Sequence, residues 1–354
     1  MKILYGVNGE GMGHAMHAAV IAKHLIAKGH NVQFAVGSGR AASRLASKWP
    51  SQVVTVPGLT FNIENNRVNP FMTLVSNFAK HTFASPWSHI LSAVRVTPPD
   101  VVISDFEPWS ARYAMLARKP LISVDSNRFL DRCKHPREWV ANNRTAAALM
   151  YPVVSNMTPC ADRYMVMTFA AAPIVKEATS LHLPVLRSEV LDKPVSNAGH
   201  VVAYLHGSGD HPKMVGAFQK VNAQFRLYGA KVDSPQTLGN VTLLPVSEDG
   251  FMSDLASCKA VIGSAGFTTI TEAVYLGKPM LAMPFEGHFD QILAASYLEG
   301  LGYGEQTREM TAEKVGGFLE RALDYRRKLA ALPKHDRNTE LLSSLDRAIL
   351  EVTS

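Results

Sequence analysis

The residues that could carry chemistry gather around two glycine-rich turns, one in each half of the chain. Residues 9–14 (Gly-Glu-Gly-Met-Gly-His) follow an apolar strand predicted at 2–7, and residues 263–269 (Gly-Ser-Ala-Gly-Phe-Thr-Thr) follow another at 260–262. Glycine lacks a Cβ, so backbone N–H groups in such turns can approach an anion, and the next helix points its positive end at that charge. The two turns therefore predict a phosphate or diphosphate ligand, as in a nucleotide.

A histidine and a carboxylate in the first half form a candidate catalytic pair. His14 begins the helix predicted at 14–28, and Asp105 follows the apolar strand predicted at 101–103. Because parallel strands end at one edge of a sheet, we expect both side chains at one crevice. There His14 would be a general base, and Asp105 would hold its tautomer and stabilise the imidazolium. The alternatives are a His14 that binds a phosphate or a nearby carbonyl, and an Asp105 that caps the helix starting near Trp109.

The second turn is followed by side chains that suit a sugar nucleotide. Glu272 lies one to two turns into the helix predicted at 267–276, where a carboxylate could accept both hydroxyls of a ribose. Asp290 and Gln291 offer an acceptor and a donor for the vicinal hydroxyls of a sugar. Alone, the segment around Asp290 would be a surface turn with a capped helix; together with the preceding turn it indicates a nucleotide sugar.

The pattern of apolar runs predicts the scaffold. Five short apolar runs in the first half, at 2–7, 31–36, 52–56, 101–103 and 121–124, alternate with helical stretches at 14–28, 40–48 and 109–118. The second half repeats the alternation with strands at 201–205, 225–228, 241–244, 260–262 and 279–282. The predicted fold class is therefore α/β, with two Rossmann-like, doubly wound domains that face a shared cleft.

The length of 354 residues fits two domains. We predict a first domain over 1–185, a second over 186–333, and a last helix over 334–354 that packs back on the first domain. The connection at 172–199 is rich in proline and poor in helix signals. Two long inserts, at 60–95 and 127–160, are expected to shape a binding face.

Composition narrows the function classes. The net charge of +6 favours anionic ligands, but the basic residues are scattered and no nucleic-acid-binding motif accompanies them, so no nucleic-acid partner is expected. No stretch approaches the roughly 18 apolar residues of a membrane span, and residues 1–6 begin a strand without signal-peptide features. Three cysteines without C-x-x-C spacing indicate neither disulfides nor zinc, and a reducing cytoplasm is expected. Asp105 and Glu107 alone are a weak metal signal, and no metal is expected.

The first turn departs from the dinucleotide fingerprint. It lacks the third glycine at the required spacing, and no acidic residue ends the second strand, which disfavours NAD. Arg40, after Gly37-Ser38-Gly39, leaves an NADP enzyme as an alternative. A tight strand–helix crossover without any ligand is the structural alternative for the three glycines.

The second half resembles a known superfamily. The order of the turn at 263–267, Glu272, Gly277-Lys278-Pro279, Pro284 and Asp290-Gln291 is similar to the donor half of GT-B glycosyltransferases, in the branch of the peptidoglycan UDP-N-acetylglucosamine transferase and the UDP-glycosyltransferases. Residues 9–14 resemble a microbial group of that superfamily. The chain differs from the peptidoglycan enzyme in having one glutamine, Gln291, in place of a longer glutamine-rich stretch. It also lacks the tryptophan-rich uracil platform of the plant enzymes.

The resemblance implies a metal-independent, inverting transfer of a sugar from a UDP-sugar to an acceptor hydroxyl, with no cofactor besides the donor substrate. It places the acceptor in the first domain and the donor in the second, with His14 as base and Asp105 as its orienter. A nucleotide-sugar hydrolase, a non-hydrolysing epimerase and a non-catalytic sugar-nucleotide-binding subunit are the alternatives. The predicted donor-binding residues are Gly11, Gly13, Gly207, Ser208, Ser264, Ala265, Gly266, Phe267, Thr268, Glu272, His288, Asp290 and Gln291.

The residues of the inserts indicate the kind of acceptor and where it would bind. Aromatic residues and cations there would suit a lipid-linked or otherwise apolar acceptor, reached by peripheral contact with the inner face of a membrane. The equally weighted alternative is that the aromatics are core residues. The residues concerned are Phe71, Phe78, Phe83, Trp87, Arg128, Arg132, Lys134 and Arg137.

Overall fold

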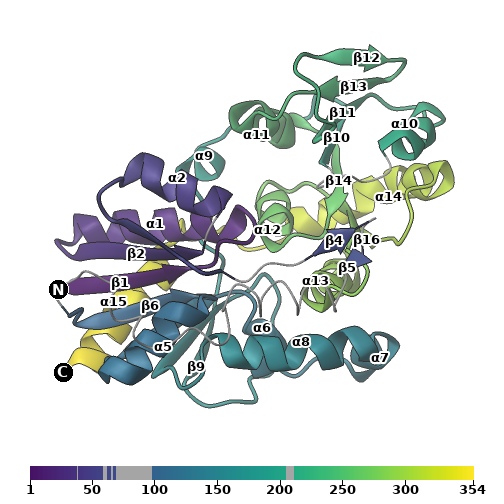
Figure 1. Cartoon of the computed structure of the whole chain (residues 1–354). Helices are drawn as coiled ribbons and strands as arrows, with labels where there is room; N and C mark the ends of the chain where they lie inside the picture. Colours follow the sequence, from purple (N-terminus) through teal and green to yellow (C-terminus); the bar gives the residue numbers. More distant parts are fainter. Residues whose placement is uncertain (38, 59–61, 65–66, 69–97, 205–210) are drawn as a thin grey trace. The chain divides into compact units, whose positions relative to one another are not determined.

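The computed structural model describes residues 1–37, 39–58, 62–64, 67–68, 98–204 and 211–354. It divides into two compact units. The first comprises Met1–Asn62, Asn69–Arg187 and Asp336–Ser354, and the second comprises Ile63–Val68 and Ser188–His335. Each is built on a seven-stranded sheet, which confirms the predicted α/β class (Figure 1).

The sheet of the first unit is parallel throughout. Its order is β3-β2-β1-β6-β7-β8-β9, so the chain winds outward from β1 to β3 and then returns to the other side of β1 with β6. The strands are β1 (Lys2–Val7), β2 (Asn31–Gly37), β3 (Val53–Val56), β6 (Val101–Asp105), β7 (Leu121–Asp125), β8 (Arg163–Met167) and β9 (Thr179–His182). The reversal between β1 and β6 is a topological switch point, the edge at which open α/β sheets bind ligands.

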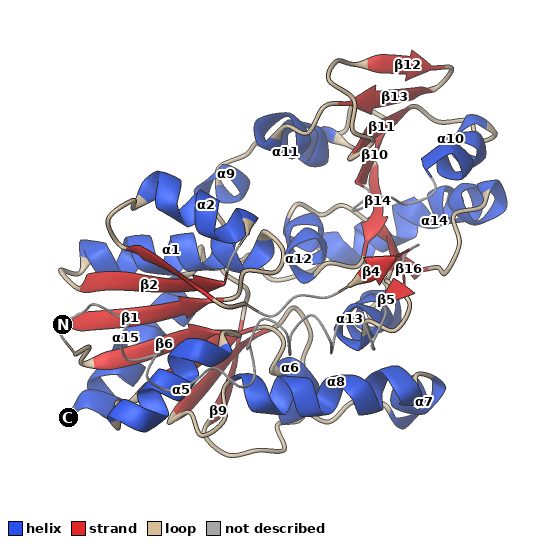
Figure 2. Ribbon diagram, viewed as in Figure 1, coloured by secondary structure: helices blue, strands red, loops and turns tan. Residues whose placement is uncertain are grey.

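Helices cover both faces of this sheet because right-handed crossovers that run in opposite directions along it place their helices on opposite sides (Figure 2). Helix α5 (Pro108–Ala117) packs through Trp109 and Tyr113 against Leu4 and Val102. The last helix, α15 (Thr339–Thr353), packs on β6, β7 and β8 and lies beside α1 (Gly13–Ala27), since Nε2 of His24 is 2.9 Å from Oδ1 of Asp346. The helices are α1 (Gly13–Ala27), α2 (Arg40–Lys48), α5 (Pro108–Ala117), α6 (Phe129–Arg132), α7 (Arg137–Asn142), α8 (Arg144–Met157) and α15 (Thr339–Thr353).

The second unit repeats the plan with one antiparallel edge strand. Its order is β12-β13-β11-β10-β14-β15-β16, in which only the β12–β13 pair is antiparallel. The strands are β10 (Val201–Tyr204), β11 (Phe225–Tyr228), β12 (Gln236–Leu238), β13 (Val241–Leu244), β14 (Ala260–Ser264), β15 (Met280–Met283) and β16 (Gly304–Gln306). A two-stranded ribbon of β4 (Ile63–Glu64) and β5 (Arg67–Val68) groups with this unit.

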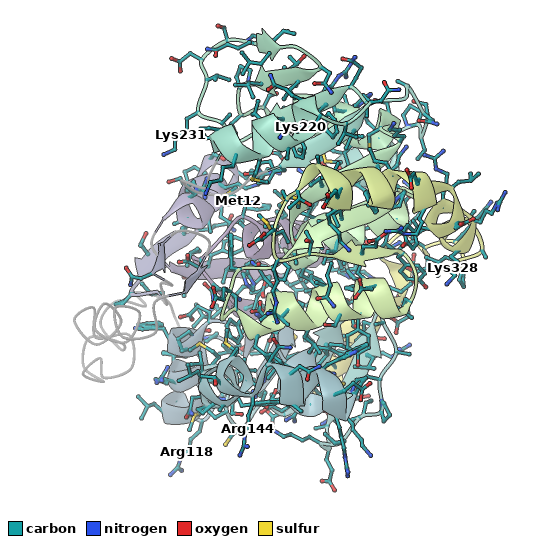
Figure 3. All side chains as sticks on the ribbon, turned by 90° about the vertical axis from the view of Figure 1, so that its right-hand side faces the viewer. Met12, Arg118, Arg144, Lys220, Lys231 and Lys328 are labelled. Carbon is teal, nitrogen blue, oxygen red and sulfur yellow. The ribbon has the colours of Figure 1, made fainter. Side chains whose placement is uncertain are left out.

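The core of the second unit lies between its sheet and two helices. Phe218 of α10 stacks on Phe225 of β11 with ring centroids 4.5 Å apart, and Phe318 of α14 joins the same cluster. The helices are α9 (Ser188–Leu191), α10 (His211–Gln219), α11 (Glu248–Ser257), α12 (Phe267–Tyr275), α13 (Phe289–Gly300) and α14 (Ala312–Ala330). Figure 3 shows Lys328, in the last turn of α14, at the right-hand edge of the view.

Two segments are more regular than the sequence predicts. The stretch at 127–160, treated above as an insert, forms α6, α7 and α8, even though Pro152 lies inside α8. The connection at 172–199 contributes β9 to the first sheet and contains α9. β9 is a short edge strand, and edge strands have weak sequence signatures because one side of the backbone is unpaired. None of the helices in the described ranges has the length and apolar composition of a membrane span.

Candidate active site

The structure brings His14 and Asp105 into contact at the switch point of the first sheet. Nδ1 of His14, in the first turn of α1, is 2.6 Å from Oδ1 of Asp105, the last residue of β6. The Asp105 side chain is fully buried, whereas that of His14 is 18% exposed. A buried carboxylate at Nδ1 fixes the ring with Nδ1 protonated, so the lone pair falls on Nε2. The pair therefore has the geometry of a base and its orienting group.

An aromatic ring supports the histidine. Phe106 lies over the imidazole of His14 with ring centroids 6.2 Å apart and an angle of 9° between the planes. Phe106 adopts a φ of 51°, in the left-handed region that aromatic residues rarely enter. Such a conformation costs about 1–2 kcal/mol and persists where neighbouring contacts hold it.

Buried titratable groups surround the pair. His17, one turn further along α1, has its pKa lowered to about 4 by burial, against the attraction of Asp105. His17 is therefore neutral near pH 7 and does not form an ion pair with Asp105. His14 is the histidine that interacts with the Asp105 carboxylate. Burial also raises the pKa of Asp125, at the end of the neighbouring strand β7, to about 6 despite Arg128. Oδ2 of Asp105 and the hydroxyl of Tyr5 are buried without a hydrogen-bond partner among the described atoms.

The helix cap in this region is Glu107 rather than Asp105. The Glu107 carboxylate accepts hydrogen bonds from the backbone N–H groups of Trp109, at 2.7 Å, and Ser110, at 2.6 Å. The alternative interpretation of Asp105 as the cap of α5 is therefore wrong. Burial raises the pKa of Glu107 to about 7, although these two hydrogen bonds act in the opposite direction.

The glycines of the first turn have different roles. Gly9 is needed for close packing, because a Cβ there would lie 2.4 Å from the carbonyl carbon of Gly37 in β2. Gly11 has a φ of 77° and open space where a Cβ would stand, and Gly13 is the first residue of α1. The structural alternative of a tight crossover thus explains Gly9, while Gly11 and Gly13 remain candidates for ligand contact.

In the second unit, the two turns predicted to bind the donor follow neighbouring parallel strands. Both therefore lie at the carboxyl-terminal end of the sheet. β14 and β15 are adjacent and parallel, with Ser264 opposite Met283, so the turns that follow them share that end. Gly266 has no side chain to cap α12, and the backbone N–H groups of Phe267 and Thr268 lie in its first turn. Ala265 is fully buried behind this turn.

The side chains predicted to bind the sugar are held by local contacts. His288, the N-cap of α13, contacts Asp290 through Nδ1, and the side-chain oxygen Oε1 of Gln291 accepts a hydrogen bond from the Phe285 N–H at 3.1 Å. Burial would raise the pKa of Asp290, but the charge and hydrogen bond of His288 lower it overall. Asp290 is therefore an anion at neutral pH. A sugar could use its second carboxylate oxygen and the Gln291 NH₂ group.

Other predicted residues are less accessible or lie outside the described ranges. Glu272, in the middle of α12, is only 3% exposed. Gly207 and Ser208, and the aromatics Phe71, Phe78, Phe83 and Trp87, fall outside the described residues. In the ranges that are described, no three His, Cys, Asp or Glu residues are grouped as metal ligands.

Two of the cations predicted to meet a membrane are instead internal. The Arg128 guanidinium donates to the carbonyls of Val154 and Thr158 and pairs with Asp131 at 3.1 Å. Arg132 lies over the Tyr164 ring, 3.3 Å from its centroid. Both are buried and cannot reach headgroups, whereas Lys134 and Arg137 are exposed. Sequence spacing does not reveal this, because the partners are backbone carbonyls and a ring that the fold brings close.

Asn8 is a site residue that the sequence did not single out. It directly follows β1, is 4% exposed, and hydrogen-bonds to both the first turn and the loop that carries Phe106. Its position in the sequence could have marked it. An asparagine between a buried strand and a glycine-rich turn can bridge two loops, because its side-chain amide both donates and accepts hydrogen bonds.

In comparisons with known proteins, a family model and a relative that each match most of the chain are both glycosyltransferases. The model of glycosyl transferase family 1 matches residues 1–322. A glycosyltransferase of Methanosarcina acetivorans is 27% identical over 347 residues, covering 89% of this chain and 88% of the relative.

Solved structures share the fold at low sequence identity. A UDP-glucosyltransferase from Polygonum tinctorium matches with a TM-score of 0.64 and 14% identity, covering 99% of this chain and 98% of that one. The spinosyn rhamnosyltransferase SpnG in complex with thymidine diphosphate matches with a TM-score of 0.62 and 16% identity, covering 98% and 100%. These likenesses confirm the predicted fold.

Proposed function

The chain belongs to glycosyl transferase family 1 and is a glycosyltransferase, and from that premise we propose that it moves a sugar from a UDP-sugar to an acceptor hydroxyl, without a metal and with inversion at C1. The observation that carries this proposal is the contact between His14 and Asp105 at the switch point of the first sheet.

The proposed step is a single displacement. Nε2 of His14 accepts the acceptor's hydroxyl proton while that oxygen bonds to C1 of the sugar. The bond from C1 to the diphosphate oxygen breaks, and UDP leaves with the electron pair. The positive charge that develops on His14 lies beside the buried carboxylate of Asp105, which stabilises it. Attack opposite the leaving group inverts C1.

The diphosphate is proposed to sit at the edge shared by the β14–α12 and β15–α13 turns. Backbone N–H groups at a helix N-terminus favour an anion through hydrogen bonds and the helix dipole, so they can stabilise the leaving diphosphate in place of a metal ion. The anionic Asp290 would then accept from sugar hydroxyls, and the Gln291 NH₂ group would donate to them, since the Gln291 side-chain oxygen accepts from the Phe285 N–H.

Uridine is proposed over thymidine on the resemblance of residues 263–291 to UDP-sugar enzymes. The named similar structures include both a UDP-glucosyltransferase and a complex with thymidine diphosphate, so the base needs a direct test. We propose thermal-shift measurements with UDP-, dTDP- and GDP-sugars. A donor at 100 times its Kd should stabilise the protein by about 2.7 kcal/mol. A shift with dTDP- or GDP-sugars alone would overturn the UDP assignment.

The acceptor is proposed to be apolar and met at an anionic membrane surface. On the first unit, α5 and α8 pack together and expose Met115, Leu116 and Leu149, and the cations Arg118 and Arg144 are exposed on the same helical pair (Figure 3). Apolar groups beside cations suit an interface with anionic lipids. Sedimentation with anionic liposomes should show binding at low salt that weakens at high salt, and Leu149→Ser should reduce it. Absence of binding at low salt would contradict the proposal.

His14 supplies the test of the chemistry. Replacing it by alanine should cut turnover by about 10²–10⁴-fold and leave donor affinity within a few-fold. If His14→Ala instead abolished donor binding while turnover per bound donor persisted, His14 would be a diphosphate ligand and the proposed base would be wrong.

A further inference from the structure

Asn8 ties together the two loops that carry the catalytic pair. Its side-chain NH₂ donates to the Phe106 carbonyl at 3.1 Å, and its side-chain carbonyl accepts from the Glu10 N–H at 2.7 Å. Its own backbone N–H donates to the Asp105 carbonyl at 3.0 Å. One buried residue therefore holds the carbonyl of the last residue of β6 through its backbone, and the next carbonyl and one N–H of the β1–α1 turn through its side chain.

The hydrogen bonds of Asn8 reach the catalytic pair through the peptide group of Phe106. Phe106 has the strained φ of 51° and stacks over His14, and it directly follows Asp105. The other side of the loop is fixed separately, since the Ser104 hydroxyl donates to the Glu107 carbonyl at 2.8 Å and accepts from the Glu107 N–H at 3.1 Å. Among these contacts, only those of Asn8 join the loop to the turn that leads into His14.

We infer that Asn8 is a positioning residue for the reaction: its side chain sets the orientation of the His14 imidazole against Asp105 by clamping the Phe106 peptide to the β1–α1 turn. The inference rests on the proposed role of His14 for its kinetic consequence, but its structural part is independent of that role. Loss of the clamp leaves buried polar groups without these partners and lets the strained loop relax.

The test compares Asn8→Ala with a matched variant, Asn240→Ala. The Asn240 side chain donates to three backbone carbonyls, those of Phe218, Val221 and Ala223, at 2.8–3.0 Å within the second unit. It serves as a control for the general effect of losing a part-buried amide. Asn8→Ser, which retains a shorter hydroxyl, provides a milder variant if Asn8→Ala does not fold.

Two readouts are made on the full-length protein. The ¹⁵N shifts of selectively labelled histidine report the tautomer of His14 in the free enzyme, and steady-state kinetics report kcat and the donor KM. We expect Asn8→Ala to mix the His14 tautomers and to lower kcat by about 10–100-fold, with the donor KM within a few-fold. Asn240→Ala should lower Tm and leave both readouts unchanged.

The outcomes separate the two proposals. If Asn8→Ala lowers Tm but keeps the wild-type His14 tautomer and kcat, Asn8 is only a structural residue and the inference is overturned. If Asn8→Ala mixes the tautomers but His14→Ala leaves turnover intact, the positioning holds and the proposed base is wrong. A rise in donor KM with unchanged kcat would also contradict the inference, because it would place Asn8 in donor binding.

Discussion

Nδ1 of His14 lies 2.6 Å from Oδ1 of Asp105, although 91 positions separate the two residues in the chain. β1 and β6 are paired in parallel with Val7 opposite Asp105, so the helix that follows β1 begins beside the end of β6. The contact thus follows directly from the strand order. It gives the imidazole of His14 a buried carboxylate partner at Nδ1, which supports the proposed role of His14 as a base.

Asp105→Asn should lower turnover while the protein stays folded. The amide keeps the shape of the side chain but cannot stabilise the imidazolium, and it can hold the wrong tautomer of His14. We expect a loss in kcat of up to about 10⁴-fold with the donor KM within a few-fold. Steady-state kinetics with circular dichroism as the folding control measure this. Wild-type kcat in a folded Asp105→Asn protein would exclude the orienting role.

Two substitutions among the predicted donor-binding residues should distinguish contacts with the nucleotide from contacts with the sugar. Glu272→Ala is expected to weaken UDP and UDP-sugar alike, because a ribose contact is common to both. Because Glu272 is only 3% exposed, we expect a ribose contact to involve a local rearrangement. Asp290→Ala is expected to weaken the UDP-sugar and leave UDP nearly unchanged. Calorimetric titration of both ligands against both variants decides the point, and equal losses of UDP affinity in the two proteins would refute the sugar assignment.

His17 should make the fold sensitive to acid. Its pKa is lowered to about 4 in the folded protein from 6.5, so between these values the unfolded chain binds more protons. Stability from this residue is therefore present above pH 6.5 and falls as pH drops toward 4, by about 3 kcal/mol in all. Urea unfolding of the wild type and His17→Gln across pH 4–7 measures the difference. Parallel curves for the two proteins would count against a neutral, buried His17.

Glu107 should change the stability of the fold with pH in the opposite direction to His17. Its pKa is raised to about 7 from 4.5, so the folded protein binds more protons between these values and stability falls as pH rises through that window. The change expected is about 3 kcal/mol, measured as the difference between wild type and Glu107→Gln at pH 4.5 and pH 8. The glutamine keeps one of the two cap hydrogen bonds, so a constant offset is expected as well. A difference that does not vary with pH would disprove the titration.

Gly9→Ala should destabilise the fold through backbone overlap. The new Cβ would lie 2.4 Å from the carbonyl carbon and oxygen of Gly37, and backbone atoms cannot rotate away as side chains do. We expect a loss of about 1–3 kcal/mol. Gly216→Ala in α10 is the matched control, since nothing lies within 4 Å of its Cβ, and a helical glycine replaced by alanine should gain about 0.5–1 kcal/mol. Thermal unfolding of both variants tests the contrast.

Local sequence patterns were enough to predict most of the scaffold and the places of the candidate residues along it. The strands predicted at 2–7, 225–228 and 241–244 coincide with β1, β11 and β13, because short segments rich in apolar and β-branched residues between turn signals favour strands. The helix predicted at 40–48 coincides with α2. By contrast, β8, β9, β12 and β16 were not predicted. Three of them, β9, β12 and β16, are three or four residues long and lie at sheet edges, where pairing rather than composition defines the strand, whereas β8 is an interior strand that follows the segment interpreted as an insert.

Several contacts between distant residues became known from the three-dimensional arrangement. It gave the cap of α5 to Glu107 and buried Arg128 and Arg132, which the sequence predicted at a membrane surface. The contact between His14 and Asp105, by contrast, was already predicted from the sequence. The three-dimensional arrangement also revealed Asn8 as the link between two loops 98 positions apart. The physical reason is that hydrogen bonds and desolvation depend on distances between elements set by strand order and packing, whereas local sequence fixes only the periodicity within each element.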